Sequence, residues 1–255
     1  MIEFIVGVLA FLVAWMLVPG LRKLAFRWKF YDMPNKRKIH REPLPMLGGA
    51  AIFAGFLVAT LVVYKYWATA ADTYFGLLIG ALLLFGIGLI DDFYKTRKKD
   101  FPAAPRFLIH IIAAGCVAYF GGSVQGFTMP FPDPHYVAFS PVLSTIVTIV
   151  WIVGVINVFN FLDGMDGLAG GIATISATTL SFVALVKGEV PSAIWGFALA
   201  GAALGFLRHN FFPARIIMGD AGSTLIGFLL ASISVIGAFK SVTVISIFVP
   251  VLALG

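Results

Sequence analysis

The stretch VLSTIVTIVWIVGVINVF at residues 142–159 decides the fold, because it runs for 18 residues without a charged side chain. A helix that crosses a bilayer needs about 20 mostly apolar residues, so this stretch predicts a transmembrane helix. The whole chain of 255 residues has the same character, since 60% of it is hydrophobic and only 12% is charged. Soluble globular chains are about a quarter charged and disordered chains are poor in hydrophobic residues, so both classes are excluded.

Apolar runs of this kind recur along the chain between charged or Pro- and Gly-rich breaks. They predict about nine spans, at residues 2–21, 47–66, 73–90, 106–121, 142–159, 168–186, 191–207, 223–239 and 241–255. We therefore expect an all-α, polytopic transmembrane protein with a single integral-membrane domain over residues 1–255. The connection at 122–141 is long, and its residues 124–131 could form a short hairpin. The single Cys excludes a disulfide framework and a Cys-based zinc site.

The basic residues lie mostly on one side of the predicted membrane. Nine alternating spans bring four connecting segments to that side, at residues 22–46, 91–105, 160–167 and 208–222. Together with Arg106 at the rim, these segments hold 15 of the 18 Lys and Arg residues. The positive-inside rule makes this side cytoplasmic and the N-terminus external. The net charge of +6 therefore reflects membrane topology, and we expect the lipid bilayer rather than nucleic acid as a partner.

Acidic residues gather on the same side. Four of the acids on this side lie at or near the ends of predicted helices. Five acids come from three separate segments, namely Asp91, Asp92, Asp163, Asp166 and Asp220. A carboxylate at membrane depth costs roughly 2.5–3.5 kcal/mol or more, so such groups usually face a protein interior or an aqueous cavity. The parity of the spans brings all five to one face of the membrane. This convergence is the main indication of function in the sequence.

The first acidic segment is GLIDD at residues 88–92. Adjacent carboxylates repel each other, so burial without a cation would raise the pKa of at least one of them. A divalent metal ion or a basic group of a substrate would relieve this repulsion. The alternative is a solvated helix end, with Lys95, Arg97, Lys98 and Lys99 as counter-ions. This segment alone leaves both interpretations open.

The second segment is NFLDGMDGLAGG at residues 160–171. Asn160, Asp163 and Asp166 are spaced i, i+3 and i+6, which one helical turn or a tight loop could gather on one side. Oxygen ligands of this kind suit Mg²⁺, and the glycines allow the backbone to approach a ligand closely. The alternative is a Gly-rich turn between two spans, capped by Asp and Asn.

The third segment is MGDAGS at residues 218–223, directly before an apolar run. Asp220 or Ser223 could cap a helix N-terminus here. Alternatively, Asp220 binds Mg²⁺ while the helix N-terminus faces phosphate oxygens, and the other two clusters favour this interpretation. A basic loop at residues 32–49 contains prolines and a Gly pair, which indicates a shaped site for a lipid head group or a nucleotide phosphate. The alternative for this loop is a simple topology anchor.

Together these segments resemble the polyprenyl-phosphate N-acetylhexosamine-1-phosphate transferases, the group that contains the initiating enzymes of teichoic-acid and O-antigen synthesis. The matching motifs are DMPNKRKIH…PLPMLGG at 32–49, GLIDD at 88–92, NFLDGMDGLAGG at 160–171 and MGDAGS at 218–223. The motifs follow one another in the order expected for this family. The first motif is more similar to the GlcNAc-1-phosphate branch than to the phospho-MurNAc-pentapeptide translocases.

The resemblance implies a Mg²⁺-dependent enzyme, with Mn²⁺ as a substitute, in a bacterial-type plasma membrane with its active site on the cytoplasmic face. It would transfer GlcNAc-1-phosphate from UDP-GlcNAc, a UDP-N-acetylhexosamine, to undecaprenyl phosphate and release UMP. Asp220 with Asn160 would bind the metal, and Asp91 or Asp92 would orient or deprotonate the lipid phosphate. Asp163 would serve the catalytic cavity. The substrate-binding residues would be Arg37, Lys38, His40, Arg106, Gly164, Asp166, Gly167 and Ser223.

Two departures from the family pattern leave alternatives open. Arg106 stands where the family commonly carries a Lys, which keeps the charge but changes the geometry. Family members also continue into a cytoplasmic His-rich loop and further helices, which residues 1–255 do not include. The alternatives are a truncated inactive form or a relative that binds lipid and nucleotide sugar without turnover. A transporter is disfavoured because the acids lie at one rim, and a homodimer is expected by family analogy.

Overall fold

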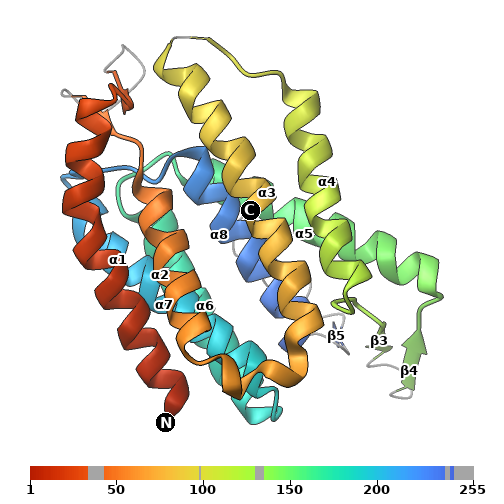
Figure 1. Ribbon diagram of the computed structural model, residues 1–255. Helices are drawn as coiled ribbons and strands as arrows, with labels where there is room; N and C mark the ends of the chain where they lie inside the picture. The colour runs from red at the N-terminus through yellow and green to blue at the C-terminus, as the bar shows by residue number, and fades with distance from the viewer. Residues whose placement is uncertain (34–42, 98, 130–134, 239–241, 244–255) are drawn as a thin grey trace.

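The computed structural model describes residues 1–33, 43–97, 99–129, 135–238 and 242–243. Within them, eight α-helices form an antiparallel bundle (Figure 1). Each helix forms where the sequence predicts an apolar run, because a helix satisfies its own backbone hydrogen bonds in lipid. The helices are α1 (Ile2–Arg27), α2 (Gly48–Val62), α3 (Ala71–Thr96), α4 (Ala103–Tyr119), α5 (Pro141–Leu162), α6 (Leu168–Val186), α7 (Val190–Asn210) and α8 (Gly219–Ile233). The short turns η1 (Tyr64–Tyr66) and η2 (Ala68–Ala70) precede α3, and the π-helical turn η3 (Ser234–Ala238) extends α8.

Six helical segments of the described chain are long and apolar enough to cross a membrane, whereas α2 and α4 are apolar but shorter. The chain is therefore a mostly helical protein with several membrane-spanning segments, and the count of about nine spans stays a prediction. The predicted ninth span, at 241–255, lies outside the described residues except for Val242–Thr243. These two residues form a strand, so the prediction of a helix is wrong there.

Short strands connect the helices, so the prediction of an all-α fold is wrong in the loops. The strands are β1 (Tyr31–Asp32), β2 (Leu44–Pro45), β3 (Gly126–Met129), β4 (His135–Ala138) and β5 (Val242–Thr243). β1 pairs antiparallel with β2, β3 pairs antiparallel with β4, and β5 pairs parallel with β3. The hairpin expected near 124–131 is confirmed, although its second strand begins beyond that range. Backbone groups outside the helices still need hydrogen-bond partners, which these ladders supply.

α8 lies at the centre of the bundle, and all of its residues are buried. α7 is nearly as buried and packs closely against α1. A side chain in place of Gly201 would collide with the backbone of Gly7, so only a small residue allows this crossing. Such crossings let helix backbones approach each other within a membrane. The outer helices α1 and α5 instead expose large apolar side chains such as Met16 and Val150, as expected for a surface that faces lipid.

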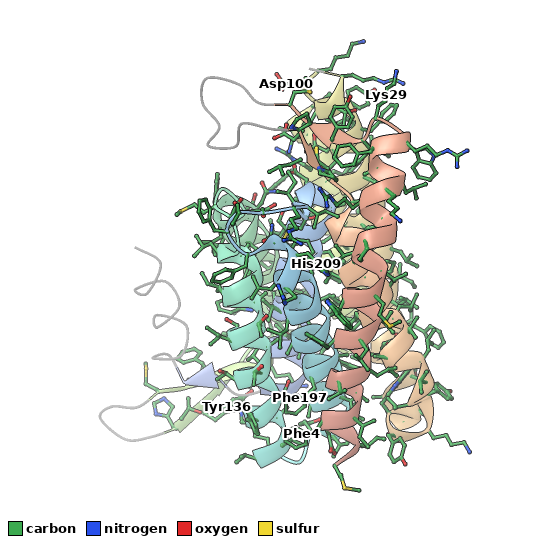
Figure 2. The ribbon with its side chains drawn as sticks, turned by 90° about the vertical axis from the view of Figure 1, so that its left-hand side faces the viewer. Phe4, Lys29, Asp100, Tyr136, Phe197 and His209 are labelled. Carbon is green, nitrogen blue, oxygen red and sulfur yellow. The ribbon has the colours of Figure 1, made fainter. Side chains whose placement is uncertain are left out.

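The two ends of the bundle differ in content. The acidic end holds the described parts of the connections α1–α2, α3–α4, α5–α6 and α7–α8, and the hairpin end holds β3 and β4 (Figure 1). Lys29 and Asp100 lie at the extreme of the acidic end, Tyr136 lies at the hairpin end, and His209 lies between these levels (Figure 2). The four segments that were predicted to share one side therefore meet at one end. Which membrane face this end occupies stays a prediction.

Candidate active site

The N-terminus of α8 is capped by a carboxylate from another helix. Asp92 on α3 is fully buried, its Oδ1 accepts a hydrogen bond from the backbone N–H of Asp220 at 2.9 Å, and its Oδ2 accepts one from Ala221 at 3.1 Å. These amides are among the N–H groups that a helix leaves unpaired at its start, and a negative charge there is favoured by the helix dipole. The alternative that Asp220 or Ser223 caps α8 through its own side chain is therefore wrong, since no such cap bond forms.

Glycines allow this close approach of α3 to α8. A Cβ atom at Gly88 would collide with the backbone of Ala221, and a Cβ atom at Gly219 would collide with the carboxylate of Asp92. Gly219 also has a φ of +68°, a conformation that glycine adopts without strain. The glycines of the GLIDD and MGDAGS motifs are thus explained by the contact that buries Asp92.

Two carboxylates and two cations alternate beside the start of α8. Lys95 Nζ lies 2.5 Å from Asp220 Oδ1 and 3.5 Å from Asp91 Oδ2. Arg106 Nη1 lies 2.9 Å from Asp91 Oδ2 and 3.4 Å from Asp220 Oδ2. Asp91 is only 2% exposed, so the interpretation of GLIDD as a solvated helix end is wrong. Lys95 is nevertheless a counter-ion, as that interpretation expected, and its position four residues after Asp91 on one helix is the signal for the pair.

Asp163 interacts electrostatically with the residues of this cluster. It follows the last residue of α5 and its backbone N–H donates to the Phe159 carbonyl at 3.2 Å. Burial and the neighbouring carboxylates of Asp220 and Asp92 raise the pKa of Asp163 well above its ordinary value. A carboxyl group with a raised pKa beside others of its kind is a common feature of functional sites, and the place of Asp163 in this site stays a prediction.

The three polar residues of the second segment do not share one helical turn. Asn160 lies on α5, where its Nδ2 donates to Ser223 Oγ at 3.1 Å, whereas α5 ends before Asp163. Asp166 is exposed in the following loop, and its Oδ2 accepts from the backbone N–H of Ala214 at 3.0 Å. Of the glycines of this loop, Gly164 is exposed, whereas Gly167 is buried and precedes α6 with a φ of +76°. Asp166 is still close enough to Asp163 for its charge to raise the pKa of Asp163, and the gathering of the three residues around one ligand stays a prediction.

The first loop meets the segment that leads to Asp220. The Ile217 N–H donates to the Pro45 carbonyl at 2.9 Å, and the Gly48 N–H donates back to the Ile217 carbonyl at 3.1 Å. The Gly49 N–H continues this pairing to the Met218 carbonyl at 3.1 Å. The predicted substrate-binding residues Arg37, Lys38 and His40 lie outside the described residues. The flanks of their loop nonetheless lie beside the start of α8.

The donor set suits one divalent cation that is shared with a phosphate ligand. In the described part of the chain, no group of three or more His, Cys, Asp or Glu side chains is arranged to hold a metal ion. Mg²⁺, however, usually takes only one or two protein carboxylates and completes its shell with substrate phosphates and water. Asp91 and Asp220 supply such a pair. When ionised, the four carboxylates Asp91, Asp92, Asp163 and Asp220 exceed the two cations Lys95 and Arg106 by two negative charges.

Residues 74–238 match glycosyl transferase family 4, and this range contains every charged residue of the carboxylate cluster. The chain belongs to this family. A relative from Bacillus subtilis, the probable undecaprenyl-phosphate N-acetylglucosaminyl 1-phosphate transferase, is 32% identical over all of this chain and 67% of its own length. The decaprenyl-phosphate N-acetylglucosaminephosphotransferase of Mycobacterium tuberculosis is 32% identical over 92% of this chain and 60% of its own length.

A third relative, the phospho-N-acetylmuramoyl-pentapeptide-transferase of Thermoanaerobacter sp., is 30% identical over 86% of this chain and 69% of its own length. The chain thus spans about two thirds of the length of these relatives. The resemblance drawn from the four motifs is confirmed, and the chain is a multi-pass membrane member of the family.

Sequence reasoning missed two residues of the site. Lys95 was considered only as a counter-ion, although it contacts Asp220 from a different helix. Asn210, the last residue of α7, was not considered at all. Its side chain forms hydrogen bonds with the backbone of the α5–α6 loop and of the α7–α8 loop. An Asn at a helix end is common in any protein, so its type and position alone carried no signal of function.

Proposed function

We propose that this protein transfers GlcNAc-1-phosphate from UDP-GlcNAc to undecaprenyl phosphate, with release of UMP and formation of a lipid-pyrophosphate-linked sugar. The observation that carries the proposal is the meeting of Asp91, Asp163 and Asp220 with Lys95 and Arg106 at the acidic end, within the range that matches the family. Buried carboxylates are expensive in a membrane and seldom occur without a functional reason. The names of the two relatives, which refer to undecaprenyl phosphate and decaprenyl phosphate, support the same chemistry.

The reaction is a phosphoryl transfer from the nucleotide sugar to the lipid phosphate, and it forms a new diphosphate on the lipid. A phosphate oxygen of the lipid attacks the β-phosphorus of the nucleotide sugar, the bond from that phosphorus to the bridging oxygen breaks, and this oxygen leaves with UMP. Catalysis of such a step is mostly positioning and stabilisation of charge. When bound, Mg²⁺ would neutralise the diphosphate and the charge that develops on UMP.

The residues at the acidic end have different roles in this proposal. Asp220 on α8 would hold the ion together with Asp91 on α3 and Asn160 on α5. Asp91 faces Arg106 and Lys95, so it is the carboxylate placed to orient the lipid phosphate. Asp92 already uses both oxygens on the backbone of α8, so we assign it a positioning role rather than a proton transfer.

Lys95 and Arg106 would bind the diphosphate. Each contacts both Asp91 and Asp220, so the same two carboxylates hold both cations beside the start of α8. A guanidinium group also pairs well with phosphate through parallel hydrogen bonds, so Arg106 suits this role.

The acidic end faces the cytoplasm in this proposal, and the protein lies in a bacterial-type plasma membrane. The concentration of Lys and Arg at that end supports this orientation. A water-soluble nucleotide sugar then reaches the site from the cytoplasm, and the isoprenoid lipid reaches it from the bilayer. The product would initiate a cell-envelope polysaccharide such as a teichoic acid or an O-antigen, and a homodimer remains the expected assembly.

Release of UMP by the purified chain tests the proposal. The reaction contains UDP-GlcNAc, undecaprenyl phosphate and Mg²⁺, and matched reactions omit the lipid or include EDTA. We expect UMP and a lipid-linked sugar only when both lipid and metal are present. Binding of UDP-GlcNAc without UMP would indicate the non-catalytic alternative, and the same assay on a chain extended to the length of the relatives would separate that role from a requirement for further residues.

A further inference from the structure

Asn210 lies at the end of α7 and is only 3% exposed. Its Oδ1 accepts a hydrogen bond from the backbone N–H of Gly167 at 3.0 Å, and its Nδ2 donates to the carbonyl of Ile216 at 2.9 Å. Both ends of the amide are thus used by backbone groups of two different loops. An Asn side chain is well suited to this arrangement, because one end accepts and the other donates.

These two loops lead directly to the carboxylates of the site. Gly167 follows Asp163 by four residues in the α5–α6 loop, and Ile216 precedes Asp220 by four residues in the α7–α8 loop. A second link joins the same loops, since Asp166 Oδ2 accepts from the Ala214 N–H at 3.0 Å. Asp166 is exposed, however, whereas Asn210 is buried, so the link through Asn210 is the better protected from water.

We propose that Asn210 is a positioning residue whose amide sets the place of Asp163 relative to Asp220. This inference rests on the proposed function, because it concerns the geometry of that site. Removal of the amide would leave a buried N–H and a buried C=O without their partner, and such groups cost more than the bond itself contributes. The two loops would then form other hydrogen bonds, and the carboxylates next to them, Asp163 before Gly167 and Asp220 after Ile216, would shift.

The first readout is hydrogen exchange, which needs no turnover. In Asn210→Ala, we expect faster backbone exchange in residues 164–168 and 212–218 and unchanged exchange at the hairpin end. The matched control is Thr148→Val. Thr148 is also buried and also joins two backbone groups, accepting from the Val124 N–H at 3.0 Å and donating to the Ser144 carbonyl at 2.7 Å, but it lies near the hairpin end. This control should loosen only residues near Val124.

The second readout is the split between kcat and KM for UMP release. A misplaced catalytic group lowers the rate far more than it weakens binding, so we expect kcat of Asn210→Ala to fall about 10- to 100-fold. The KM values for UDP-GlcNAc and undecaprenyl phosphate should change less than about 3-fold. Thr148→Val should keep the kcat of the wild-type protein. A purely structural role for Asn210 would lower the amount of folded protein and leave the kcat of that fraction unchanged.

If Asn210→Ala does not fold, the substitution Asn210→Asp is used in the same exchange experiment. It keeps the shape and the acceptor for Gly167, but it turns an oxygen toward the Ile216 carbonyl, so exchange should rise mainly in residues 212–218. Unchanged exchange in both loops would overturn the inference, as would an equal loss of kcat in Thr148→Val. If neither the wild-type chain nor the chain extended to the length of the relatives releases UMP, the proposed function fails, whereas the exchange experiment still decides whether Asn210 holds the two loops together.

Discussion

The acidic end and the hairpin end are built from the same helices, yet they are held together by different chemistry. At the hairpin end the buried links are neutral: Trp67 donates to the Thr60 carbonyl at 2.8 Å, and the hydroxyls of Thr60 and Tyr74 share a hydrogen bond of 2.7 Å. At the acidic end, neutral links such as those of Asn210 are joined by charged ones that involve buried carboxylates. Neutral hydrogen bonds are evidently sufficient to join these helices.

The charged links therefore require another explanation. Removal of a carboxylate from water carries a large penalty, which pairing with a cation offsets only in part. The acidic end bears this penalty at Asp91, Asp92 and Asp220, whereas the described residues of the hairpin end bury no carboxylate. The comparison indicates that the acidic end is organised for chemistry and the hairpin end for stability. Substitutions at both ends can test this division.

The largest effect is expected for Asp91→Asn. It removes the carboxylate that faces Lys95 and Arg106, so UMP release should fall by about 100-fold or more, in the range typical of catalytic acid–base groups. The thermal unfolding midpoint should stay the same or rise, because one of several repelling carboxylates is lost. A parallel loss of stability and activity would show that Asp91 serves structure instead.

Asp92→Asn should lower both stability and activity. An Asn amide can accept from only one of the two backbone N–H groups that Asp92 now binds, and its own NH₂ would face the other. One buried N–H group left without an acceptor costs about 1–3 kcal/mol, which a thermal or denaturant unfolding curve can detect. Full stability with Asp92→Asn would contradict the assignment of Asp92 as the cap of α8.

Two glycines on α3 give a sharper comparison within one helix. A Cβ atom at Gly88 would meet the backbone of Ala221, whereas a Cβ atom at Gly86 would meet no atom of the described chain within 4 Å. Gly88→Ala should therefore destabilise the fold by about 1–3 kcal/mol through overpacking. Gly86→Ala should be neutral or stabilising by roughly 0.5–1 kcal/mol, because Ala is the better helix former. Equal unfolding midpoints for the two variants would refute the close α3–α8 contact.

A smaller effect is expected from pH. The pKa of Asp163 is raised in the folded protein by burial and by the carboxylates of Asp220 and Asp92, so the folded state holds this proton above pH 3.8, where the unfolded chain has released it. The contribution of Asp163 to stability is then largest at low pH and declines as pH rises toward the folded-state pKa. In EDTA, Asp163→Asn should gain thermal stability relative to the wild-type protein as pH rises. A difference that is constant from pH 5 to pH 8 would contradict the raised pKa.

The sequence predicted eight helices close to their observed positions, because each is an apolar run between charged or Gly- and Pro-rich breaks. It also predicted that Asp91, Asp92, Asp163 and Asp220 would meet, because helix parity alone brings their segments to one end. It did not predict the short strands other than the hairpin. Two-residue strands such as β1 depend on a partner loop and have no periodicity of their own.

The roles of individual residues were harder to predict than their location. Asp92 caps α8 from 128 residues away in the chain, and Asn210 joins two loops that the sequence does not mark as neighbours. Lys95 is recognisable as a partner of Asp91 on its own helix, but its contact with Asp220 depends on the packing of α3 against α8. Such partners follow from tertiary structure, which residue type and spacing do not determine.

The most direct measurement compares Mg²⁺-dependent UMP release by Asp220→Asn and Asp72→Asn. Asp220 belongs to the acidic end, whereas Asp72 lies exposed in the first turn of α3 near the hairpin end; Asp133, another acid predicted to be external, lies outside the described residues. We predict that Asp220→Asn is expressed and folded but releases no UMP above the EDTA control, and that Asp72→Asn retains the wild-type rate. Wild-type turnover by Asp220→Asn would remove Asp220 from the metal site and contradict the assignment of chemistry to the acidic end.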